Sequence, residues 1–205
     1  AINKLIENTK ELLNSPTNSN IIFKSPTGSG KTIMVAEFIH RLIKDKISNK
    51  EICFIWAGPR RTLTEQSKEK LTKYLNKFKD LKCSSFSELE NNEILENEIL
   101  FLNWESINKK NKSTIIVENE REFFLSKVLE KTKDKRRDIF LIIDESHHHA
   151  TSEISKKLID EISPKIAIEV SATPVVSNPD AIINVKLDDV KLEGLIKKTV
   201  ILNEK

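Results

Sequence analysis

The sequence predicts an α/β fold in which helices cover both faces of a mainly parallel sheet. Three observations lead to this prediction: β-branched runs alternate with helix-periodic segments, the runs are almost continuously apolar, and a glycine-containing loop directly follows the first run. Such alternation is typical of βαβ units, and strands covered on both faces lose the apolar-polar alternation of half-exposed strands. We therefore expect a single three-layer domain over residues 1–205.

Each element of this fold has its own segment. The five expected strands are the apolar runs Ile21–Phe23, Ile52–Trp56, Ile99–Leu102, Ile139–Ile143 and Ile166–Val170. Apolar side chains recur at helical spacing in the segments 35–43, 71–78 and 154–162, which are the helices expected to cover the sheet. The stretch 106–137 is rich in Lys, Asn, Glu and Arg, and we predict a surface insertion with one helix around Phe123–Leu129.

Composition excludes several classes of protein. Hydrophobic residues make up 38% and charged residues 32% of the 205, as in ordinary soluble domains, and no apolar run reaches the roughly 20 residues that cross a bilayer. Cys53 and Cys83 have no CxxC partner, so neither a disulfide nor a zinc site is expected. We expect a cytoplasmic protein without membrane contact. The net charge of +3 is too small to indicate nucleic acid by itself.

A phosphate-binding loop is predicted at Ser25–Thr32, SPTGSGKT, between an apolar run and an amphipathic segment. Its glycines let backbone amides turn toward phosphate oxygens, at the positive end of the next helix. Lys31 is suited to reach the β- and γ-phosphates, and the Thr32 hydroxyl to hold Mg²⁺. Ser25 stands where the general pattern has glycine. The expected nucleotide-binding residues are Pro26, Thr27, Gly28, Ser29, Gly30, Lys31 and Thr32.

Two adjacent carboxylates end the apolar run of FLIIDESHH, Phe140–His148. Residues at the carboxyl end of a strand in an open α/β sheet project into the ligand crevice. We expect Asp144 to bind Mg²⁺ together with Thr32, and Glu145 to orient and deprotonate the water that attacks the γ-phosphate. Without the preceding loop, an Asp-Glu pair after a strand is more often a helix cap.

The histidines at 147–149 suggest a metal site, but adjacent residues point in different directions, so a hydrogen-bonding role for His147 or His148 is the favoured interpretation. Farther along, VSATP (Val170–Pro174) ends another apolar run. Ser171 and Thr173 fall on one side of an extended chain, where their hydroxyls could bond the carboxylates or a histidine of DESH.

In this order, SPTGSGKT, DESH and SATP resemble motifs I, II and III of superfamily 2 helicases and translocases. The resemblance implies a P-loop NTPase of RecA-like fold, with ATP bound between two such domains. It also implies that Lys31, Thr32, Asp144 and Glu145 carry the ATP and Mg²⁺ chemistry. The residues that would couple this site to movement on nucleic acid are His147, Ser171 and Thr173.

WAGPRRTLTEQS, Trp56–Ser67, is similar to motif Ia of the same families, which contacts the nucleic-acid backbone. The resemblance makes Arg60, Arg61 and Thr62 the candidates, although adjacent arginines are often simply solvated. Asn103 and Trp104 follow a strand at the same side of the predicted sheet. Trp104 could stack on a base, brace the loop, or pack in the core, as tryptophans more often do.

Two segments, Phe101–Lys112 and Asp188–Glu204, narrow the resemblance to the restriction subunit of type III restriction-modification enzymes, which joins a motor to a nuclease. This implies DNA as substrate, a second motor domain in the same chain, and a modification (methyltransferase) subunit as partner. The sequence contains neither a second α/β half nor a nuclease signature. We therefore expect a fragment with little activity alone.

Two other functions stay open. The chain could be the motor domain of another superfamily 2 enzyme, acting on DNA or RNA. It could instead be a nucleotide-dependent nucleic-acid binding switch that has lost turnover, although a decayed site would be expected to lose one of Lys31, Thr32, Asp144 or Glu145.

Overall fold

The computed structural model describes residues 1–76, 78, 81–104, 115–145, 153–175, 178–186 and 188, with the side chains of all of these except 115–124 and 153–155. The strands are β1 (Ser19–Lys24), β2 (Ile52–Gly58), β3 (Lys82–Ser84), β4 (Glu98–Asn103), β5 (Asp138–Asp144), β6 (Ile166–Ser171) and β7 (Ala181–Asn184). The helices are α1 (Ile2–Leu13), α2 (Lys31–Lys44), α3 (Arg61–Leu75), α5 (Ile115–Asp134) and α6 (Glu153–Ile162), with a 3₁₀ turn η1 at Phe86–Glu88.

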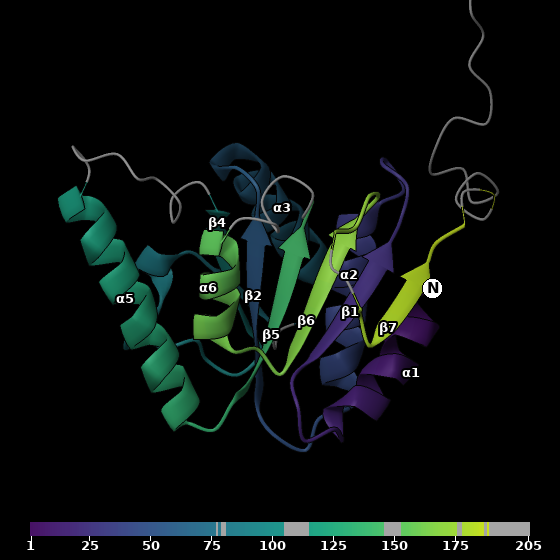
Figure 1. The fold of residues 1–205 in the computed structure, drawn as a ribbon, viewed down its shortest axis with the longest axis horizontal. Coiled ribbons are helices and arrows are strands. Elements are labelled where there is room, and N and C mark those ends of the chain that lie inside the picture. The colour runs from purple at the N-terminus through teal and green to yellow at the C-terminus, as the bar shows by residue number, and fades with distance from the viewer. Residues whose placement is uncertain are drawn as a thin grey trace, which may run out of the picture.

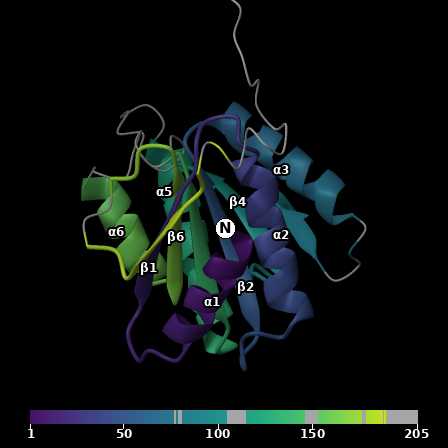
Figure 2. The ribbon, with the colours of Figure 1, turned by 90° about the vertical axis from the view of Figure 1, so that its right-hand side faces the viewer.

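The strands form one seven-stranded sheet in the order β3-β4-β2-β5-β6-β1-β7, and every pair is parallel (Figure 1). Helices α1, α2 and α3 lie on one side of the sheet and α6 on the other (Figure 2). This confirms the predicted three-layer α/β fold. Because the strands are parallel, all of their carboxyl ends meet at a single edge.

The core is divided by the sheet into two apolar clusters. One holds the buried faces of α1, α2 and α3, and includes Phe38, Leu71 and Trp56. The other packs α5 and α6 against the opposite face, through residues such as Val128 and Leu158. Successive side chains of each central strand enter the two clusters alternately, which explains why the strands are apolar without interruption.

The five predicted strands are all present, and two short strands at the margins, β3 and β7, were not predicted. The prediction for 106–137 is partly wrong. Helix α5 is longer than expected, and its C-terminal half buries Leu125, Val128 and Leu129 in the core, so this part packs against the sheet and is no surface insertion. Residues 105–114 lie outside the described part of the chain.

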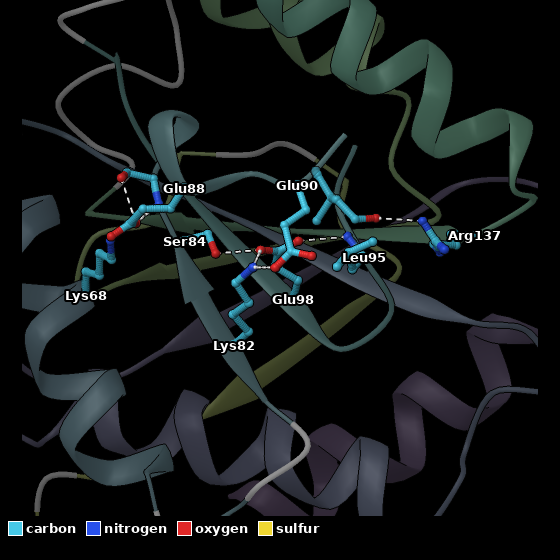
Figure 3. A network of polar contacts seen from close by, with 10 residues as sticks. Lys68, Lys82, Ser84, Glu88, Glu90, Leu95, Glu98 and Arg137 are labelled. Atoms are coloured by element: carbon cyan, nitrogen blue, oxygen red, sulfur yellow. Dashed lines mark hydrogen bonds and ion pairs between the residues drawn. The ribbon is translucent and has the colours of Figure 1, made fainter. Parts of the chain in front are cut away.

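A polar network joins the margin of the sheet at β3 and β4 (Figure 3). At its centre is Glu98, which is 1% exposed. The Glu98 carboxylate accepts hydrogen bonds from Ser84 Oγ at 2.5 Å and from the Leu95 amide at 2.8 Å, and Lys82 Nζ lies 3.3 Å away. Each oxygen of this buried carboxylate therefore has a donor. In the described part of the chain, no helix is long and apolar enough to cross a membrane.

Candidate nucleotide site

The segments that the sequence singled out follow different strands of the sheet and meet at its carboxyl edge. The glycine loop follows β1, the segment with Arg60 follows β2, Asp144 ends β5 and Ser171 ends β6. In the sheet, β6 lies between β5 and β1, and β2 borders β5 on the other side. Residues far apart in the sequence are thus brought together by the parallel register, as expected for a ligand crevice in this architecture.

The loop after β1 has the backbone that the two glycines were expected to provide. Gly28 has φ 77° and Gly30 has φ 80°, both in the left-handed region that favours glycine. Gly30 is the N-cap of α2, and its carbonyl accepts the amides of Ile33 and Met34. The loop therefore leads directly into a helix N-terminus, where amides and the helix dipole favour an anion.

Ser25, the departure from the general pattern, has a structural explanation. Its side chain is fully buried, and its hydroxyl shares a 2.5 Å hydrogen bond with that of Ser29. The Ser25 amide donates to the Ser171 carbonyl at 3.1 Å. The extra hydroxyl at position 25 therefore pins the loop internally, while the backbone at the same position attaches the loop to β6.

Lys31 and Glu145 form an ion pair at the centre of the site, with Nζ and Oε1 2.6 Å apart. Lys31 is the first residue of α2 and is only 8% exposed, and the nearby carboxylate compensates the cost of burying its ammonium. Glu145 has φ 50°, and its amide donates to the Val170 carbonyl. The sharp turn after β5 thus directs the Glu145 side chain to the lysine of the phosphate loop.

Asp144, at the end of β5, is the second carboxylate of the site. Burial raises the pKa of this carboxyl from its usual 3.8 to about 6, and the negative charge of Glu145 adds to the effect. The Lys31 ammonium and a hydrogen bond from Ser67 Oγ, 3.4 Å from Asp144 Oδ2, act to lower the pKa. Strongly shifted carboxyls in a crevice are characteristic of functional sites.

The donor set fits ATP with Mg²⁺. Lys31 already pairs with an anionic group, the Glu145 carboxylate. The loop glycines turn the backbone at a helix start, and Thr32 follows Lys31 on the first turn of α2. Where side chains are described, no group of three or more His, Cys, Asp or Glu could hold a metal ion. An ion here would rely on Thr32, Asp144 and oxygens of the nucleotide, which suits Mg²⁺.

Among the predicted coupling residues, Ser171 is buried at the end of β6 and Thr173 is exposed just beyond it. The Thr173 amide donates to Ser171 Oγ at 3.1 Å, so the hydroxyl supports the turn that follows the strand. Glu169, not predicted, extends this arrangement, since its buried carboxylate accepts the Val175 amide at 2.7 Å. His147 lies outside the described residues.

The candidates for nucleic-acid contact divide by exposure. Arg60, Arg61 and Thr62 are exposed at the start of α3, where Arg61 pairs with Glu65 on the following turn. Asn103 is half-buried at the end of β4. Trp104 must be removed from the set, because it is 1% exposed and packed in the core, so that neither ring face is open to a base.

Helix α3 approaches the site closely because β2 ends in glycine. A Cβ at Gly58 would lie 2.2 Å from Thr64 Oγ1, which is too close for any other residue without movement. This contact brings Ser67, one turn farther along, within reach of Asp144. Ser67 was missed as a site residue, because no local pattern distinguishes a serine on a helix.

Comparisons with known proteins agree with this arrangement. A family model described as the res subunit of type III restriction enzymes (ResIII) matches residues 1–176. A nuclease-deletion mutant of the type ISP restriction-modification enzyme LlaGI, in complex with a DNA substrate mimic, is similar with a TM-score of 0.54 and 15% identity, over 96% of this chain and 20% of that one. This likeness shows a shared fold.

A variant of S. cerevisiae Dbp5 bound to RNA and ADP BeF3 has a TM-score of 0.49 and 16% identity, over 98% of this chain and 46% of that one. The chain therefore spans less than half the length of either structure. A search of curated proteins found no match.

Proposed function

The chain belongs to the family of type III restriction enzyme res subunits, a family with a superfamily 2 helicase-type motor domain, and on this premise we propose that it hydrolyses ATP to drive movement on DNA. The observation that carries the proposal is the Lys31–Glu145 ion pair beside the half-buried Asp144. It joins the phosphate loop to the two carboxylates needed for metal-assisted phosphoryl transfer.

Each residue has a distinct role in this proposal. Lys31 leaves Glu145 and binds phosphate oxygens, while the loop amides hold the remainder of the phosphate chain. Thr32 and Asp144 would hold Mg²⁺, which would neutralise the charge that develops on the phosphates. Glu145, released from Lys31, orients a water and accepts its proton. A divalent cation beside the Asp144 carboxylate would favour its charged form.

The proposal for the complete protein goes further. DNA contact is assigned to Arg60, Arg61 and Thr62, whose exposure at a helix start suits phosphate oxygens. A second motor domain would close over the nucleotide and supply arginines, and a nuclease domain and a modification subunit would complete a restriction enzyme. The second motor domain, the nuclease domain and the modification subunit are supported by the family alone, and we propose a cytoplasmic location on the same basis.

The test is ATP hydrolysis by the full-length protein, with double-stranded DNA, with RNA and without nucleic acid, for wild type and Glu145→Gln. We expect stimulation by DNA and a fall of about 10²- to 10⁴-fold in kcat for the variant, the usual contribution of a general base. Glu96→Gln is the matched control, since Glu96 is exposed and precedes β4, at the edge of the sheet opposite to the site.

Three outcomes separate the functions that stay open. Stimulation by DNA that disappears in Glu145→Gln supports the motor. Stimulation by RNA alone replaces the restriction role with that of an RNA helicase. Binding of ATP without turnover under any of these conditions makes the protein a switch and contradicts the enzymatic proposal.

A further inference from the structure

Two donors outside the recognised ATP motifs lie on the same face of the sheet as Asp144. The first is Ser67 on α3, a buried residue whose Oγ lies 3.4 Å from Asp144 Oδ2. This hydrogen bond is long, and within the described part of the chain the Asp144 carboxylate accepts no shorter one. A carboxylate held by so weak a donor is free to rotate when an ion arrives.

The second donor is the indole of Trp56. Trp56 pairs with Ile142 across β2 and β5, and Asp144 lies two residues beyond Ile142, so both side chains are on the same face of the sheet. Trp56 Nε1 is buried and makes no hydrogen bond of normal geometry to the described residues. Its N–H belongs to a side chain that lies diagonally across the two strands from Asp144, on the face that carries the carboxylate.

An unpaired N–H in the core costs about 1–3 kcal/mol, so a donor left in this state at the position diagonal to Asp144 needs an explanation. Metal ligands are oriented by partners behind them, and such partners affect affinity nearly as much as the ligands do. A rotation of the Asp144 carboxylate would let one oxygen accept both donors while the other faces the ion. Contacts that are weak in this conformation would then become stronger when the ion binds.

We propose that Ser67 and Trp56 are positioning residues that orient Asp144 toward Mg²⁺. The proposal deepens the proposed function and rests on it. It has a consequence for coupling, since Ser67 belongs to the helix whose first residues include Arg61 and Thr62. The helix assigned to DNA contact is thereby bonded to the ligand of the metal.

The first experiment measures binding of the non-hydrolysable analogue AMP-PNP by calorimetry, once with Mg²⁺ and once with EDTA. Ser67→Ala is expected to weaken binding with Mg²⁺ by about tenfold, the lower end of the usual range for such partners, and to leave metal-free binding unchanged. Ser67→Thr keeps the hydroxyl and is expected to recover most of the loss. Ser84→Ala is the matched control, because Ser84 also donates to a buried carboxylate, that of Glu98.

The second experiment uses the two tryptophans. Trp56→Phe removes the N–H and keeps an aromatic ring, and we expect a loss of about threefold to tenfold that is again confined to binding with Mg²⁺. Trp104→Phe makes the same chemical change to a second indole that is buried without a hydrogen-bond partner among the described residues, but on the opposite face of the sheet. It is expected to leave the ratio of the two affinities unchanged.

The outcomes distinguish the inference from the function on which it rests. If wild type binds AMP-PNP in neither condition, the proposed function fails and the inference falls with it. If wild type binds but Ser67→Ala and Trp56→Phe lose affinity equally with and without Mg²⁺, or lose none, only the inference is overturned. A loss confined to Mg²⁺ and recovered by Ser67→Thr supports it.

Discussion

Asp144 and Glu98 are carboxylates that belong to strands of the same sheet, yet their hydrogen-bond partners differ. Glu98, at the β3 and β4 margin, accepts from Ser84, from Leu95 and from Lys82 (Figure 3). Asp144, at the carboxyl edge, has one long hydrogen bond within the described structure and a pKa raised to about 6. The first carboxylate is satisfied by the protein. The second has fewer partners, and a strongly shifted carboxyl of this kind is more typical of a functional site than of a structural network.

The largest expected effect comes from breaking the satisfied network. Glu98→Ala should lower the free energy of unfolding by about 3–5 kcal/mol, because it leaves Ser84, the Leu95 amide and Lys82 without their shared acceptor. Urea denaturation followed by circular dichroism measures the change. Glu98→Gln, which preserves the shape and one acceptor, should cost clearly less. Equal stability of wild type and Glu98→Ala would show that the network contributes nothing.

Substitution of Asp144, measured in the same way, should instead raise the free energy of unfolding. Between about pH 4 and pH 6 the folded Asp144 keeps a proton that the unfolded chain releases, so wild-type stability falls as the pH rises through this window. Asp144→Asn avoids this loss and should be more stable than wild type by up to about 3 kcal/mol near pH 8. The difference should vanish below about pH 4. A variant that is less stable than wild type at both pH values contradicts the comparison.

The smallest expected effect on stability comes from substitution of Gly30 in the phosphate loop. Gly30 has a left-handed backbone, but a Cβ added there would meet nothing within 4 Å, so Gly30→Ala should cost only the conformational penalty of about 1–2 kcal/mol. Gly30→Asn should cost less, since asparagine adopts this conformation more readily. Thermal unfolding of the two variants checks this order. A much larger loss for alanine would indicate a steric contact.

The fold could be predicted because its central strands are continuously apolar and its helices are periodic. The marginal strands could not, since Lys82–Ser84 contains only Cys83 as an apolar residue and Ala181–Asn184 buries only Ile183. Such short edge strands form because a neighbour offers free backbone groups, which is a property of the assembled sheet.

The site divides in the same way. Lys31, Asp144 and Glu145 were predicted because each belongs to a local pattern whose chemistry is visible in the sequence. The bond from Ser67 to Asp144 spans 77 residues and depends on how α3 packs over β2, so no local pattern indicates it. For Trp104 the sequence left base stacking and core packing open, with packing more common for tryptophan, and the ring is buried in the core.

Because Lys31 is paired with Glu145, the Glu145 carboxylate competes with any incoming anion for the lysine. Any anion that approaches Lys31 must displace a carboxylate that is attached to the same molecule and therefore present at high effective concentration. A small ion such as sulfate or inorganic phosphate makes few further contacts that would compensate for the loss of this ion pair. A ligand that also binds the loop amides, and the carboxylates through a metal, makes more contacts. Competition with Glu145 therefore favours ligands that make several contacts at once.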